Sequence, residues 1–124
     1  NRYYHNLSYD TVYLDFDDTL VIRSEVNTLL MSLVYQFRNQ GKKIILITKC
    51  KDDIRQMLKK YAIAEDLFQK IIHLSADDFK PDHIKIKSSI FIDDSFSERK
   101  KVSETCEIPT FDCSMIEMLI DERI

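Results

Sequence analysis

The 124-residue sequence has no long apolar run, no signal peptide and only three cysteines. No segment approaches the ~20 consecutive apolar residues that a membrane-spanning helix needs, and no basic segment leads an apolar stretch with a cleavage site. The cysteines form no CxxC pair, so neither a disulfide framework nor a cysteine zinc site is indicated. We therefore expect a soluble, cytoplasmic protein.

The sequence also lacks a basic cluster. Its net charge is −3, and no long run of Lys and Arg gives the electrostatic footprint of a nucleic-acid or anionic-membrane binder. Hydrophobic residues make up 44% and charged residues 31%, which is typical of a packed globular protein. We expect residues 1–124 to form a single domain, and because the sequence begins at Asn1 this domain could be a module of a longer chain.

Short apolar runs alternate with longer segments of helical period, which predicts βαβ units around a parallel sheet. The unbroken apolar run at 44–47 predicts a central strand covered on both faces. We therefore predict an α/β fold, a Rossmann-like three-layer α/β/α sandwich with a five-stranded parallel sheet. The five expected strands are Thr11–Phe16, Lys43–Thr48, Lys70–Leu74, Ser89–Ile92 and Ile108–Phe111.

About five helices are expected between and after these strands. The first carries apolar residues at helical spacing from Val26 to Phe37 and ends before Gly41, the only glycine, which suits a helix C-terminus. A second helix is expected over 54–61. Two Ser-x-x-Glu capping boxes predict the starts of further helices, at Ser95 and Ser114.

Acidic residues follow two of the predicted strands. Asp15, Asp17 and Asp18 follow the first strand, and Asp93 and Asp94 follow the fourth. If these strands are neighbours, the carboxylates share one edge of the sheet, where two charges 4 Å apart repel by ~4 kcal/mol at an effective dielectric near 20. A cation is therefore expected. Oxygen ligands without a His or Cys cluster suit Mg²⁺, which also allows a carboxylate to meet a phosphoryl group.

Four segments resemble the motifs of the haloacid dehalogenase-like superfamily. Residues 12–20, Val-Tyr-Leu-Asp-Phe-Asp-Asp-Thr-Leu, resemble the first motif, an apolar strand followed by DxDx[TV]. Residues 44–48 resemble the second motif, Lys80 is placed like the lysine of the third, and residues 90–94 resemble the fourth. The resemblance implies a phosphatase of the type with four aspartates. It also implies a member without a cap domain, because neither usual insertion point holds enough residues for one.

The resemblance implies a role for each residue of these motifs. Asp15 would form an aspartyl-phosphate, and Asp17 would protonate the leaving oxygen and then activate water. Thr48 would hold a phosphoryl oxygen, while Lys80 would offset the charge on Asp15 and on the transferred group. Magnesium would be bound by residues from the first and fourth motifs, namely Asp15, Asp17, Asp93 and Asp94.

Two of these assignments remain open at the level of sequence. Asp93 and Asp94 cannot be ordered as direct and indirect metal ligands. Lys85 competes with Lys80 as the motif lysine, and we favour Lys80 because Pro81 fixes the turn around it.

The function and the substrate also have alternatives. The chain could be a catalytically idle module of a multidomain protein, or a receiver-like domain that accepts a phosphoryl group. As an enzyme it would act on a phosphorylated substrate of unknown class, and either the substrate is large or another domain or subunit supplies the lid. Arg23, Glu98 and Arg99 are candidate substrate contacts at the edge of the predicted site.

Overall fold

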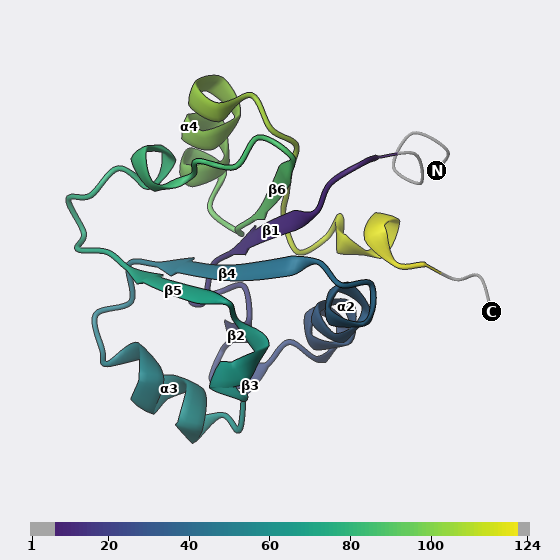
Figure 1. Ribbon diagram of the computed structural model, residues 1–124. Coiled ribbons are helices and arrows are strands. Elements are labelled where there is room, and N and C mark those ends of the chain that lie inside the picture. The colour runs from purple at the N-terminus through teal and green to yellow at the C-terminus, as the bar shows by residue number, and fades with distance from the viewer. Residues whose placement is uncertain (1–6, 122–124) are drawn as a thin grey trace.

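The computed structural model describes residues 7–121, and a five-stranded parallel sheet lies at its centre (Figure 1). The order across the sheet is β5-β4-β1-β6-β7. The strand β4 lies inside the sheet, between β5 and β1, as its unbroken apolar run predicts. The predicted parallel α/β fold is therefore confirmed. The strands are β1 (Thr11–Leu14), β4 (Lys43–Thr48), β5 (Lys70–His73), β6 (Ser89–Ile92) and β7 (Thr110–Phe111).

The order of these strands separates the fold from that of a receiver domain. Taken in chain order, the five strands are arranged 3-2-1-4-5 across the sheet. Receiver domains have the order 2-1-3-4-5, in which the third strand lies beside the first. Here the neighbour of β1 on that side is the fourth strand of the sheet, β6, so the receiver-like alternative does not fit this topology.

Helices cover both faces of the sheet, giving the three layers that the sequence predicts. Figure 1 shows α4 on one side of the sheet and α2 and α3 on the other. No helix within residues 7–121 has both the length and the apolar character required to cross a membrane. The α-helices are α2 (Thr28–Asn39), α3 (Ile54–Lys60) and α4 (Phe96–Cys106), and the 3-10 helices are η1 (Glu65–Leu67), η2 (Lys80–His83) and η3 (Ile116–Leu119).

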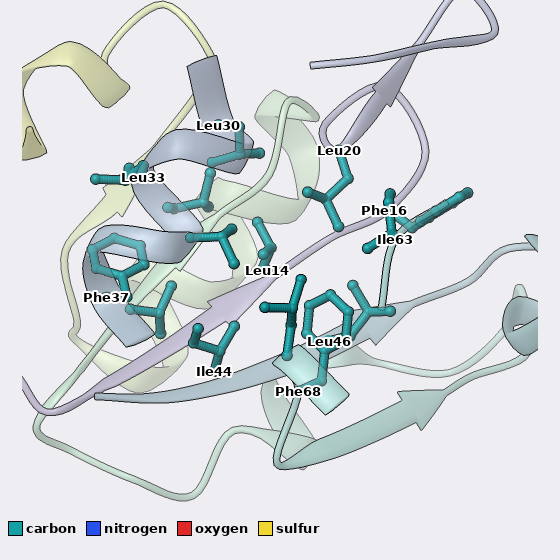
Figure 2. Close-up of a cluster of buried hydrophobic side chains, with 14 of the residues drawn as sticks. Leu14, Phe16, Leu20, Leu30, Leu33, Phe37, Ile44, Leu46, Ile63 and Phe68 are labelled. Atoms are coloured by element: carbon teal, nitrogen blue, oxygen red, sulfur yellow. The ribbon is translucent and has the colours of Figure 1, made fainter. Parts of the chain in front are cut away.

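Alternating side chains of the strands supply two cores, one on each face. Leu14 of β1 packs with Leu33 and Phe37 of α2 on one face (Figure 2). Tyr13, the residue before Leu14, points to the other face and belongs to the cluster that contains Val102 of α4. All five side chains are at most 2% exposed. Because period-2 alternation places apolar residues on both faces of β1, this strand is fixed in the middle of the molecule.

A two-stranded antiparallel hairpin follows the first motif, and the sequence did not predict it. Its strands are β2 (Val21–Ile22) and β3 (Glu25–Val26), joined through Arg23 and Ser24 at φ 52° and 63°. The assignment of Val26 to the first helix was therefore wrong, since α2 begins at Thr28. Hairpins of this kind usually carry Asn-Gly or Asp-Gly at the two left-handed positions, and that signal is absent here.

The two capping boxes have different outcomes. The hydroxyl of Ser95 accepts the backbone N–H of Glu98 at 3.2 Å and caps α4, as predicted. The hydroxyl of Ser114 instead donates to Asp112 Oδ1 at 2.6 Å, and only the 3-10 helix η3 follows. The predicted final α-helix was therefore wrong, because a nearby carboxylate competes for the capping hydroxyl. Gly41 lies just after α2 with φ 76°, as a helix C-terminal glycine should.

Candidate active site

The acidic segments after β1 and β6 lie side by side at the carboxyl edge of the sheet. Leu14 is level with Ile92 in the parallel pairing, and the N–H of Asp15 donates to the carbonyl of Ile92 at 3.1 Å. The hydroxyl of Thr19 accepts the N–H of Asp94 at 3.1 Å and ties the two segments together again. The strand order reverses here, which is where parallel α/β sheets place their ligand sites.

Lys80 is the buried cation of this edge. Its Nζ donates to Asp93 Oδ2 at 2.7 Å and to Asp15 Oδ1 at 3.1 Å, and the residue is 2% exposed. It reaches the carboxylates from the 3-10 helix η2, whose first turn contains Pro81. Lys85, the competing lysine, is exposed. The geometry therefore favours Lys80 as the lysine of the site.

The two adjacent aspartates of the β6 end have different surroundings. Asp93 is 1% exposed, and both of its carboxylate oxygens have partners, since Oδ1 accepts the N–H of Ser95 at 2.9 Å and Oδ2 accepts from Lys80. Asp94 is exposed. The guanidinium of Arg99 donates to the backbone carbonyls of both aspartates, at 3.0 and 2.9 Å, and holds this turn in place.

Burial and charge shift the ionisation of three groups at the site. Burial raises the pKa of Asp15 to about 7 even though the charge of Lys80 lowers it, and Lys80 is shared with the closer carboxylate of Asp93. Burial on its own lowers the pKa of Lys80, but the charges of Asp15 and Asp93 outweigh it and raise the pKa above the usual lysine value. Burial and the charge of Asp18 raise the pKa of Asp17. Asp17 therefore binds a proton more readily than an ordinary aspartate.

An open cavity of about 290 Å³ lies over this edge and is lined almost wholly by charged side chains. Lys49, Lys80 and the helix-capping Ser95 provide its hydrogen-bond donors. Its six carboxylates are Asp15, Asp17, Asp18, Asp93, Asp94 and Glu98. An excess of carboxylates in one cavity favours binding of a cation, and the two lysines offer positive charge to an anion.

Thr48 lies outside the lining of the cavity, although the sequence predicts that it would hold a phosphoryl oxygen there. It is fully buried at the end of β4, its hydroxyl accepts the N–H of Cys50 at 3.1 Å, and it does not line the cavity. The next residue, Lys49, does line it and forms an ion pair with Glu98 at 3.1 Å. Sequence reasoning missed Lys49, although its position directly after a strand was an available signal. Arg23, another candidate contact, is not part of the cavity wall.

The donor set suits a magnesium ion that keeps part of its water shell. Among residues 7–121, no three His, Cys, Asp or Glu side chains form a preformed metal cage. Mg²⁺ rarely needs one, because it usually binds through one or two carboxylates, with waters and phosphate oxygens as the other ligands. Asp15, whose Oδ2 is not bonded to Lys80, and Asp94 are two such carboxylates on the same cavity. The residues therefore fit this ion.

The chain is similar to known proteins in structure but not in sequence. No protein-family model matches the chain, and no curated protein matches it either. One similar solved structure is the N-terminal part of protein BF1531 from Bacteroides fragilis, which contains a phosphatase domain and is complexed with Mg, with a TM-score of 0.69 and 15% identity. It covers 93% of this chain, which spans only 41% of that one.

A second similar structure is an uncharacterized protein from Corynebacterium glutamicum ATCC 13032 Kitasato. Its TM-score is 0.64 at 9% identity, and the match covers 93% of this chain and 98% of the other. At such low identities, similarity of structure establishes the fold and not the activity. The chain therefore shares its α/β fold with a phosphatase-containing protein and with a second protein of almost the same extent.

Proposed function

We propose that the chain is a magnesium-dependent phosphohydrolase of the haloacid dehalogenase-like superfamily, acting through an aspartyl-phosphate on Asp15. The observation that carries the proposal is the position of the Asp15 carboxylate, 3.1 Å from the buried ammonium group of Lys80 in a cavity lined by further aspartates. A carboxylate nucleophile needs a nearby cation so that it can approach an anionic phosphate ester. The similar phosphatase-containing structure from B. fragilis supports this assignment.

The first chemical step is transfer of the phosphoryl group to the protein. A carboxylate oxygen of Asp15 attacks phosphorus, the bond between phosphorus and the ester oxygen breaks, and the leaving oxygen takes a proton from the carboxyl group of Asp17. The raised pKa of Asp17 makes its protonated form available for this step. Lys80 balances the charge that gathers on Asp15 and on the transferred group.

The second step returns the protein to its starting state. Asp17, now a carboxylate, accepts a proton from water as the water oxygen attacks phosphorus. The bond between Asp15 and phosphorus breaks and orthophosphate leaves. Bound Mg²⁺ supplies positive charge that lets two anions meet.

We assign the metal-ligand roles to Asp15 and Asp94, together with the backbone carbonyl of Asp17. Asp93 is less suited to bind the metal, because it is buried and each of its carboxylate oxygens already accepts a hydrogen bond, one from Ser95 and the other from Lys80. Its role is to position Lys80. Thr48, which is buried and does not line the cavity, would contribute to phosphate binding through its hydrogen bond to the turn that follows β4.

We further propose that the domain has no cap, because the segment between the first motif and α2 holds only the β2-β3 hairpin. The cavity is open, so the lid for the reaction would come from another domain or subunit, or from a large substrate. A cytoplasmic location remains a prediction from the sequence.

Hydrolysis of p-nitrophenyl phosphate tests the proposal. The wild-type chain should release p-nitrophenolate in the presence of Mg²⁺ and not in EDTA, and Asp15→Asn should lose the activity while keeping its circular dichroism spectrum. Glu104→Gln is the matched control, because it removes one carboxylate at an exposed position of α4. Turnover that persists in Asp15→Asn contradicts the mechanism. Absence of turnover with any divalent metal supports the idle module instead.

A further inference from the structure

The cavity contains an ion pair that the proposed chemistry does not use. Lys49, directly after β4, and Glu98, in the first turn of α4, both line the cavity, and their charged groups lie 3.1 Å apart. Their side chains are 21% and 15% exposed, so the pair is largely withdrawn from bulk water. An ion pair in such a place has a fixed geometry, which surface pairs lack.

Glu98 has a carboxylate oxygen that no described residue satisfies. Oε2 accepts from Lys49, whereas Oε1 is buried and has no hydrogen-bond partner within residues 7–121. A buried acceptor without a donor is unfavourable by about 1–3 kcal/mol, and more when it is charged. Because Glu98 forms part of the cavity wall, a rotation of its carboxylate toward the cavity would let a bound ligand supply the missing donor.

The overall charge of the cavity also favours a ligand that brings a hydrogen-bond donor or a positive charge. Six carboxyl groups and two ammonium groups line it, and even with Asp17 protonated for the first step a bound Mg²⁺ ion does not cancel the excess of negative charge. A phosphate ester adds further negative charge. A second anionic group on the same substrate would therefore meet net repulsion in spite of the two lysines, whereas a hydroxyl or ammonium group would be attracted to Glu98.

We propose that Glu98, held in place by Lys49, selects phosphomonoesters of small alcohols that carry a hydroxyl or ammonium group, and disfavours those that carry a second anion. This inference rests on the proposed phosphohydrolase function and specifies its substrate class. Glu98 accepts a hydrogen bond from the hydroxyl or ammonium substituent of the leaving alcohol, while Asp17 protonates the leaving oxygen and Asp15 receives the phosphoryl group.

Three small esters that differ mainly in charge test the selection with Mg²⁺ present. They are phosphoethanolamine with an added ammonium group, glycerol 3-phosphate with added hydroxyls, and 3-phosphoglycerate with an added carboxylate. We expect kcat/KM for phosphoethanolamine to exceed that for 3-phosphoglycerate by about tenfold or more, because the two differ by two unit charges next to Glu98. Glycerol 3-phosphate should lie between them.

Two variants locate the cause of the preference. Glu98→Gln should reduce the ratio of kcat/KM between phosphoethanolamine and 3-phosphoglycerate several-fold, and Lys49→Gln should increase it because Glu98 loses its neutralising partner. Glu104→Gln, on the same helix but exposed, should leave the ratio unchanged. Only the ratio within each variant is compared, so a general loss of rate does not affect the result.

The outcomes separate this inference from the proposed function. Hydrolysis of p-nitrophenyl phosphate with equal kcat/KM for the three small esters overturns the inference and leaves the phosphohydrolase intact. An equal loss on all three esters in Glu98→Gln also overturns it, since it indicates a role in general catalysis. If no phosphate ester is hydrolysed, the proposed function fails and the inference fails with it.

Discussion

Lys80 lies closer to Asp93 than to Asp15, at 2.7 Å against 3.1 Å, so the proposed nucleophile, Asp15, shares its cation with a closer carboxylate. Asp93 in turn is fixed by the N–H of Ser95 at the start of α4. The ammonium group of Lys80 is therefore fixed in position, but it is not paired with Asp15 alone. Burial, which is the largest cause, therefore raises the pKa of Asp15 even though the shared charge of Lys80 lowers it.

Removing the cation should destabilise the fold strongly. Lys80→Met leaves two buried carboxylates without a partner, and we expect the free energy of unfolding to fall by about 3 kcal/mol or more. The loss should be smaller at pH 5 than at pH 8, because protonation of Asp15 relieves the repulsion. Urea unfolding at both pH values measures the effect. Lys85→Met at an exposed position is the control, and an equally small change in both variants would refute a buried ion-pair network.

The raised pKa of Asp15 predicts how stability depends on pH in the absence of metal. The folded-state pKa of about 7 lies above the model value of 3.8, so the folded protein binds the proton more tightly than the unfolded chain. The resulting stabilisation is complete below about pH 4 and is lost as the pH rises through 7. Asp17 contributes in the same direction.

Urea unfolding in EDTA between pH 4.5 and pH 8 measures this contribution. The wild-type chain should lose more stability across this range than Asp15→Asn, in which the titrating group is removed. Parallel curves for the two proteins would show that Asp15 titrates normally. Glu104→Gln should follow the wild type, because Glu104 is exposed.

Much of this site was predictable because it lies at strand ends. The alternation of strands and helices predicts that Asp15 and Asp94 share an edge of the sheet if the first and fourth strands are neighbours, and β1 and β6 are neighbours. Sequence could not decide between Lys80 and Lys85, because only tertiary packing brings η2 onto the carboxylates. The difference between Asp93 and Asp94 also depends on tertiary contacts, namely which side chain turns inward to Lys80.

The start of the first helix and the final helix were predicted wrongly for another reason, which is that local contacts compete with the expected helix. Val26 has helical spacing with the residues that follow it, but β2 pairs with β3 before α2 can begin. Ser114 has the letters of a capping box, yet Asp112 takes its hydroxyl. In both cases a contact formed by nearby residues overrides a pattern that is correct on average.

The turn between β2 and β3 should be under backbone strain, which substitutions can test. Arg23 and Ser24 both have positive φ, which is unfavourable for residues with a Cβ. The double variant Arg23→Asn/Ser24→Gly supplies the residues that this turn prefers and should raise the free energy of unfolding by about 0.5–2 kcal/mol. Thermal unfolding measures the change. Ser32→Gly, in the exposed middle of α2, should lower stability instead, and a loss in both variants would contradict strain at the turn.

The hydroxyl of Thr19 should contribute more to the free energy of unfolding than the shape of its side chain does. It is fully buried and accepts the N–H of Asp94 at 3.1 Å. Thr19→Val keeps the volume but leaves that N–H without its acceptor, and we expect a loss of about 1–3 kcal/mol in urea unfolding. Thr19→Ser keeps the hydroxyl and should lose less. If the valine variant is as stable as the serine variant, the bond between the two acidic segments contributes nothing.

Substitution by Asn should affect Mg²⁺ binding at Asp94 and stability at Asp93. Asp94 is exposed on the cavity, so Asp94→Asn should weaken Mg²⁺ binding by about tenfold or more and leave the free energy of unfolding almost unchanged. Asp93→Asn removes the charge nearest to Lys80 and should destabilise the protein by about 2 kcal/mol or more, because a buried ion pair loses one partner.

Isothermal titration with Mg²⁺, with and without orthophosphate, separates the two roles. In the wild type, binding should be weak without phosphate and tighter with it, because the described residues form no complete cage and phosphate oxygens supply further ligands. Asp94→Asn should weaken binding under both conditions. If Asp93→Asn loses Mg²⁺ binding while retaining its stability, the two assignments are reversed, and Asp93 rather than Asp94 contacts the metal.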